Sequence, residues 1–135
     1  MHELPQFPEH LKTISKEDWD KLFKLIDELK ETGNITKYVS IFATYDDVEI
    51  LQKIITTLNE LDLIVGFDWI TWKEGWVFAN NIKQDKETYD LITLCKIITQ
   101  IVRHDRFCSG YLVDKINDGT VVKILEGMRQ LIFND

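Results

Sequence analysis

Two arginines three positions apart, Arg103 and Arg106, have the spacing in this sequence that most directly suggests chemistry. A guanidinium is a rigid planar fork, so two of them one helical turn apart can hold a carboxylate or a phosphate bidentately. Trp69 and Trp72 could supply a flat face for a ring or base, and Asp68 precedes them. Together these five residues predict a binding site for a small anionic ligand or a nucleotide.

The same arginines also allow a purely structural interpretation. Arg103 or Arg106 could form an ion pair with Asp68 or Asp90 across a helix packing, because structural ion pairs fix charged groups as readily as active sites do. In this interpretation the charged residues orient a helix break and bind nothing. The sequence leaves the structural and the ligand-binding interpretations open side by side.

The break itself is expected near Asp105. A carboxylate at a helix C-terminus opposes the helix dipole, so we expect Asp105 to cap a following helix that begins at Arg106. Phe107 would pack beneath this break, and Gly110 would permit a close approach of neighbouring backbone. Asp105, Asp90 and Gly110 are therefore predicted to be structural residues.

No catalytic or metal-binding set emerges from the remaining reactive side chains. His104 and Cys108 stand four positions apart, but the expected break spoils that geometry and no further ligand is evident. We expect His104 to be a solvated surface residue, and Cys95 and Cys108 to be buried, reduced thiols. The sequence thus predicts no catalytic residues, no metal and no cofactor.

Charge excludes two classes of partner. Sixteen basic against twenty-three acidic residues give a net charge of −7, so neither nucleic acid nor an anionic membrane surface is an expected partner. The first residues show no basic region followed by an apolar stretch, which would mark a secretory signal. We therefore expect a cytoplasmic protein.

Helical periodicity defines most of the elements that would position these residues. Residues 1–14 are expected to form an extended surface arm, and residues 15–135 a single helical domain. Ser15 is a good N-cap for a helix whose apolar stripe begins at Trp19 and ends before Gly33. A second helix should follow the acidic pair at 46–47, and residues 34–45 fit either a short helix or a strand. Three further helices are expected over about 88–104, from the break to about 117, and from a cap at Thr120 onward.

The segment 63–80 is ambiguous. It fits a small β-hairpin near residues 67–79, with aromatic strands on either side of a loop containing Gly75. It also fits a helix that Asp68 would cap and that would place three tryptophans on one face. Gly75 inside a helix would cost about 1 kcal/mol relative to alanine, so periodicity alone does not decide between the two.

Two motifs resemble a known family. Residues 67–72 have the form FDWxxW, residues 99–110 have the form TxxxRxxRFxxG, and Asp118-Gly119-Thr120 follows. In this order they resemble the bacterial family known as domain of unknown function 6508, over about residues 45–131. The resemblance favours a helix for residues 69–79 and implies no activity.

These observations predict a mostly α fold, a single-domain bundle of five to six helices. We expect a non-enzymatic module that binds another protein or a further copy of itself, since no nucleophile–base set or metal cluster is recognisable. The alternative is the anion- or nucleotide-binding domain built on Arg103 and Arg106, which could be enzymatic.

Overall fold

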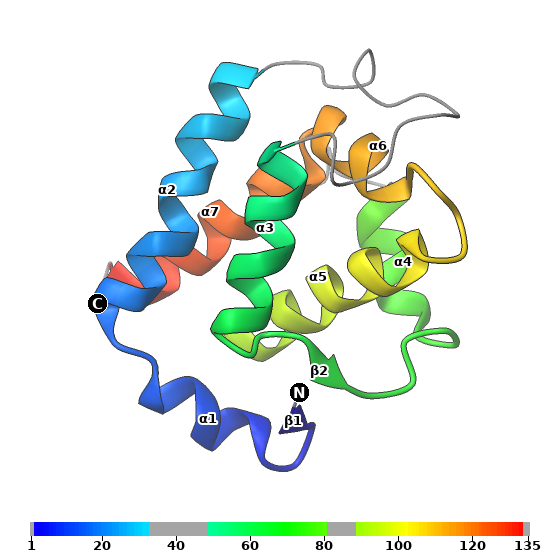
Figure 1. The fold of residues 1–135 in the computed structure, drawn as a ribbon. Coiled ribbons are helices and arrows are strands. Elements are labelled where there is room, and N and C mark those ends of the chain that lie inside the picture. Colours follow the sequence, from blue (N-terminus) through cyan, green and yellow to red (C-terminus); the bar gives the residue numbers. More distant parts are fainter. Residues whose placement is uncertain (1, 33–48, 81–88, 134–135) are drawn as a thin grey trace.

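The computed structural model describes residues 2–32, 49–80 and 89–133, and in these ranges the protein is mostly α-helical (Figure 1). The predicted fold class is therefore confirmed. The expectations for Gly33, for residues 34–45 and for the acidic pair at 46–47 lie outside the described residues. The described elements are β1 (His2–Glu3), α1 (Phe7–Thr13), α2 (Lys16–Thr32), α3 (Glu49–Glu60), β2 (Val65–Gly66), α4 (Lys73–Asn80), α5 (Leu91–Asp105), α6 (Tyr111–Asn117) and α7 (Thr120–Phe133).

Helix α2 forms where its stripe and cap predict. The hydroxyl of Ser15 accepts a hydrogen bond from the backbone N–H of Asp18 at 3.1 Å, which satisfies one of the free donors of the first turn. Trp19, Leu22 and Ile26 then lie on one face and are buried. This face packs against α3 and α7, which hold the other long apolar stripes.

Helix α7 is the central contact of the bundle. It packs against α2, α5 and α6, and it crosses behind α2 and α3 in Figure 1. Its Val121, Ile124, Leu125 and Met128 are fully buried, and α5 contributes an equally apolar face. None of the helices in the described ranges combines the length and the apolar character that crossing a bilayer requires.

The first residues do not form the expected extended arm. Residues 7–13 form α1, with a proline in its first turn, where the missing N–H of proline costs nothing. Phe7 is fully buried and Leu11 nearly so, which makes α1 part of the core. Strand β1 precedes it and pairs in parallel with β2, His2 with Val65 and Glu3 with Gly66. The sequence did not predict this helix, because seven residues are too few to show a clear helical periodicity of apolar residues.

The segment 63–80 contains no hairpin in the structure. Residues 65–66 form β2, whose partner is β1 from the beginning of the chain, and the helix α4 begins only at Lys73. Gly75 lies in the first turn of α4 and not in a hairpin loop. The prediction of a helix in this segment was therefore correct, but the helix begins about one turn later than a cap at Asp68 would give.

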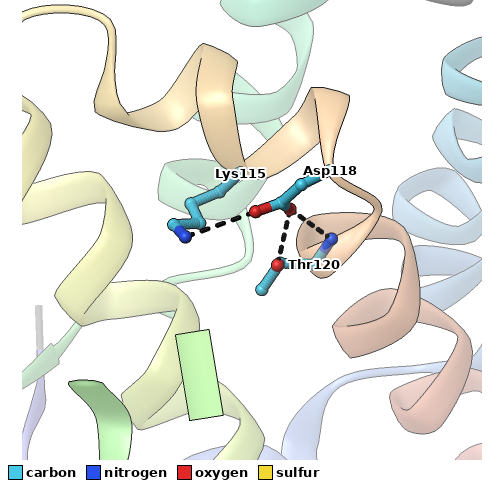
Figure 2. A network of polar contacts seen from close by, with 3 residues as sticks. All are labelled: Lys115, Asp118 and Thr120. Carbon is cyan, nitrogen blue, oxygen red and sulfur yellow. Dashed lines mark hydrogen bonds and ion pairs between the residues drawn. The ribbon is translucent and has the colours of Figure 1, made fainter. Parts of the chain in front are cut away.

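A small polar network joins α6 to α7 (Figure 2). Asp118 accepts hydrogen bonds from the backbone N–H of Thr120 at 2.9 Å and from its hydroxyl at 2.6 Å. The other carboxylate oxygen of Asp118 lies 3.3 Å from Nζ of the buried Lys115. Gly119 between them has a φ of 90°, a backbone conformation that favours glycine. The cap of α7 is thus Asp118, and Thr120 is its first helical residue.

Candidate functional site

The FDWxxW segment forms a tight turn between β2 and α4. A carboxylate oxygen of Asp68 accepts a hydrogen bond from the hydroxyl of Thr71 at 2.8 Å. The backbone N–H of Trp72 donates to the carbonyl of Trp69 at 3.4 Å, which closes the turn. Two contacts within the segment therefore hold this turn.

Gln100 of α5 holds this turn against the bundle. Its side chain is buried, and Nε2 donates to the carbonyls of Trp69 at 2.7 Å and Trp72 at 3.1 Å. Its Oε1 is buried without a hydrogen-bond partner and faces Gly75, where an added Cβ would lie only 2.1 Å away. Gly75 therefore permits the close approach of α4 to α5. Sequence reasoning missed Gln100, although an amide in the middle of a buried apolar stripe was a signal.

The two tryptophans of the motif contact different partners. The Trp72 ring packs edge-on against Phe67 at 5.5 Å between ring centres. The Lys96 ammonium lies 4.4 Å from the centre of the Trp72 ring, a cation–π contact. Trp72 is thus engaged within the fold, whereas Trp69 contacts the junction of α5 and α6.

Five rings meet at that junction. His104 is half-buried, 4.5 Å from the ring of Tyr111 and 4.9 Å from that of Trp76. Trp69 lies 6.2 Å from His104, 6.0 Å from Phe107 and 6.4 Å from Trp76, all in tilted or edge arrangements that aromatic rings prefer. The expectation that His104 is a solvated surface histidine was therefore wrong.

Phe107 and two large apolar residues next to these tryptophans in the chain are exposed. Phe107 is 75% exposed, Ile70 63% and Val77 56%, and only Phe133 joins them as an exposed large hydrophobic residue in the described ranges. The predicted burial of Phe107 is thus wrong, because the break after α5 carries it outward. Exposed apolar side chains that cluster are a mark of interaction sites. We call this region the aromatic surface, and its members are Trp69, Ile70, Trp76, Val77, His104, Phe107 and Tyr111.

The arginines do not form the expected ion pairs with the two acidic residues. Within the described residues, neither Arg103 nor Arg106 pairs with Asp68 or Asp90. Asp68 is engaged by Thr71, and Asp90 is the N-cap of α5, where it accepts from the backbone N–H of Thr93 at 2.7 Å. Arg103 is half-buried and Arg106 is exposed at the end of α5, next to Phe107.

Asp105 and Gly110 build the break between α5 and α6. Asp105 is buried, and its carboxylate accepts from the backbone N–H of Leu112 at 2.9 Å. It thus caps α6, which begins at Tyr111 and not at Arg106. Burial raises the pKa of Asp105, against the opposing effect of its backbone hydrogen bonds. Gly110 has a φ of 94°, and no atom lies within 4 Å of an added Cβ. Glycine is therefore needed here for the left-handed backbone conformation, and not for the expected close approach of neighbouring backbone.

The two cysteines have different environments. Cys95 is buried as expected, and burial raises the pKa of its thiol. Cys108 is exposed, which corrects the expectation of a buried thiol, because it lies in the turn that follows α5. In the described part of the chain, His104 and Cys108 belong to no group of side chains that could share a metal ion.

A family model matches most of the chain. The model of a family of unknown function (DUF6508) covers residues 14–134. The chain belongs to this family. The predicted resemblance is confirmed, and the whole aromatic surface lies inside the DUF6508 match, whereas β1 and all of α1 precede it. Neither the curated proteins nor the solved structures contain a significant match.

Proposed function

We propose that this protein is a protein-binding module and that the aromatic surface is its binding site. The observation that carries the proposal is the 75% exposure of Phe107 above a layer of half-buried rings. An exposed aromatic side chain costs free energy in water, and a partner that covers it recovers that cost. Tryptophan, tyrosine and arginine are also the residues that dominate the energetics of protein interfaces.

The framework of this surface supports binding without rearrangement. Gln100 holds the backbone of the Trp69 turn, and Asp105 holds the start of α6, which carries Tyr111. A surface that is ordered before binding loses little conformational entropy when a partner docks. The contacts of its rings with one another are therefore consistent with a preformed site.

A protein partner is better supported than a small anion. Trp72 contacts Lys96 and Phe67, and Asp68 accepts a hydrogen bond from Thr71. Two of the five residues predicted to bind a small anion therefore already have partners within the fold. We infer that the partner presents a bulky apolar side chain to Trp69 and Phe107, with a carboxylate near Arg106. The adjacent guanidinium would give such a contact its orientation.

The test compares two exposed phenylalanines. Wild-type protein is used to capture binding proteins from an extract of its source cells, and each captured protein is then purified and its Kd measured. Phe107→Ser should weaken binding by a factor of about 30 or more, as expected for an interface hot spot. Phe133→Ser is the matched control, because this exposed phenylalanine of α7 lies outside the aromatic surface.

One result would contradict the proposal, and two others would identify an effect on the fold or a second copy of the chain as the partner. A purified partner that binds Phe107→Ser as tightly as wild type must use another surface. Equal losses in both serine variants would indicate a general effect on the fold, which thermal unfolding of each variant reports. Self-association in sedimentation that Phe107→Ser abolishes would assign the surface to a second copy of the chain.

A further inference from the structure

Three side chains that commonly ligate metals meet beside the small sheet, away from the aromatic surface. His2 belongs to β1, His10 to α1, and Asp62 follows α3. One ligand atom from each lies within 4.8 Å of the other two. In the described residues no other group of histidine, cysteine, aspartate and glutamate side chains satisfies this criterion.

The fold brings the three residues together from separate parts of the chain. The parallel pairing of His2 with Val65 places β1 beside the segment that follows α3. At the end of α3 the backbone N–H of Leu63 donates to the carbonyl of Leu58 at 2.9 Å, which is the Schellman closure of a helix. Asp62 occupies the left-handed position of this closure, with a φ of 55°. Glycine is the usual residue there, so the carboxylate is retained at a backbone cost of about 1 kcal/mol.

The hydrogen bonds leave nitrogen lone pairs for a ligand. Nε2 of His10 lies 2.9 Å from the carbonyl oxygen of Leu61. Because a carbonyl only accepts, Nε2 must carry the hydrogen, and Nδ1 of the neutral ring keeps its lone pair. A second ring nitrogen bonded to a backbone carbonyl is the usual arrangement of a metal-ligating histidine.

Nδ1 of His2 is a buried atom that pairs with Asp62. It lies 2.6 Å from a carboxylate oxygen of Asp62, an ion-pair contact whose angles fall outside those of a hydrogen bond. The His2 ring also stacks on that of His10, with 4.1 Å between the ring centres. Three groups that can ligate a metal ion are thus held within 4.8 Å of one another, and two of them already form an ion pair.

We propose that His2, His10 and Asp62 bind a divalent transition-metal ion such as Zn²⁺. Two imidazole nitrogens and a carboxylate oxygen are a known ligand set for this ion, with bonds of about 2.0–2.2 Å and a further position open to water. Two ligand atoms on a tetrahedral ion stand about 3.4 Å apart, so His2 and Asp62 must separate slightly and the stacked rings must turn. The side chains of His2 and Asp62 are 37% and 29% exposed, which permits this movement and gives the ion access.

Binding would connect the beginning of the chain to the end of α3. An ion that binds the folded chain and not the unfolded chain raises the unfolding free energy by mass action. The stabilised elements are β1 and α1, which are two and seven residues long and join the core through Phe7 and Leu11. The metal site and the aromatic surface share no residue, so each proposal can fail without the other.

The test is a titration of the metal-free chain, without a histidine tag, with Zn²⁺ by calorimetry and with Co²⁺ by visible absorption. We expect one ion per chain and a rise in melting temperature with Zn²⁺. His2→Asn and Asp62→Asn should each weaken binding at least about tenfold and reduce the Co²⁺ absorption. Asparagine tolerates the left-handed backbone, so Asp62→Asn keeps the turn and removes only the charge.

Glu9→Gln is the matched control. It removes one carboxylate from α1, next to His10, but the Glu9 side chain is exposed and outside the cluster. It should bind Zn²⁺ as wild type does. The proposal is overturned if wild type binds no Zn²⁺, or if the two asparagine variants bind it as tightly as Glu9→Gln. Circular dichroism of each metal-free variant shows whether the variant is folded, so that loss of a ligand can be told from loss of the fold. If a variant does not fold, His2→Gln is used instead, because the His2 side chain is half-exposed.

Discussion

At the scale of single residues, three buried polar side chains of α5 each hold another segment in place. The hydroxyl of Thr99 accepts from the backbone N–H of Val65 at 3.1 Å and so fixes β2. Gln100 fixes the turn at Trp69, and Asp105 fixes the start of α6. Buried polar groups are costly unless they are paired, so these contacts specify where each segment packs. The candidate site therefore depends on α5 for the placement of β2, of the turn at Trp69 and of the start of α6.

Asp105 allows a prediction about pH. Burial raises its pKa in the folded chain above the value of 3.8 expected when unfolded, so the folded state holds the proton more tightly. The stability that this gives is fully present below 3.8 and is lost as the pH rises through the folded pKa. Asp105→Asn cannot titrate but can still accept from Leu112. We therefore expect the unfolding free energy of wild type, relative to Asp105→Asn, to fall as the pH rises from acidic to neutral in urea titrations.

Asp105→Ala separates the cap from the charge. It removes the acceptor of the Leu112 N–H, so it should lower the unfolding free energy by about 1 kcal/mol or more at every pH. A difference between wild type and Asp105→Asn that does not change with pH would show that the carboxyl titrates alike in both states.

Residue-level prediction from the sequence succeeded for apolar burial and failed for polar partners. The stripe of α2, with Trp19 buried, followed from spacing alone. The partners of Asp68 and Asp90 are nearby threonines, and the expectation of arginine partners overlooked these short contacts. Gln100 and His104 act through elements distant in sequence, and such contacts leave no periodic signal. Arg106 is next to Phe107 of the aromatic surface in the chain, whereas Asp68 and Asp90 bond to neighbouring threonines.

At the scale of elements, length decides what the sequence reveals. Helices α2, α5 and α7 contain fourteen or more residues each, and their apolar stripes predict them. Helix α1 has seven residues and α4 has eight, which is about two turns and too few for a clear period. Strand β2 has two residues and pairs with the beginning of the chain, so no local pattern could reveal it. The fold class was therefore predictable, whereas the connections that support the site were not.

The packing of α4 on α5 gives a prediction at this scale. A Cβ added at Gly75 would lie 2.1 Å from Oε1 of Gln100 and 2.6 Å from the Trp72 ring. Both side chains are packed, so Gly75→Ala must push α4 away from α5. We expect the unfolding free energy to fall by about 1–3 kcal/mol, the usual cost of overpacking, in chemical denaturation.

Gly127→Ala in α7 is the comparison. Its nearest neighbour would be a methyl group of Leu94 at 3.2 Å, the end of a flexible side chain, and alanine favours a helix interior. Its effect on the unfolding free energy should be within about 1 kcal/mol of zero. If Gly75→Ala is as stable as wild type, the close approach of the two helices does not limit stability.

At the scale of the whole molecule, the core extends beyond the family match. The match begins at residue 14, yet the core includes Phe7 and Leu11 from α1. In Figure 1 α1 lies across the end of the bundle, below α3 and next to the sheet. Helix α1, which precedes the match, is therefore part of the core and not an extended surface arm.

Phe7→Ala tests whether α1 belongs to the cooperative unit. Phe7 is fully buried, so its truncation should lower the unfolding free energy by about 3–5 kcal/mol, the usual cost for a core phenylalanine. Phe133→Ala removes a ring of equal size that is 39% exposed, so its cost should be clearly smaller. Denaturant unfolding followed by tryptophan fluorescence measures both, because Trp19 of α2 is buried in the same core. The prediction fails if both alanine variants lose the same small amount of unfolding free energy, in a single transition whose denaturant dependence equals that of wild type. That result would mean that α1 detaches before the bundle unfolds and contributes little to its stability.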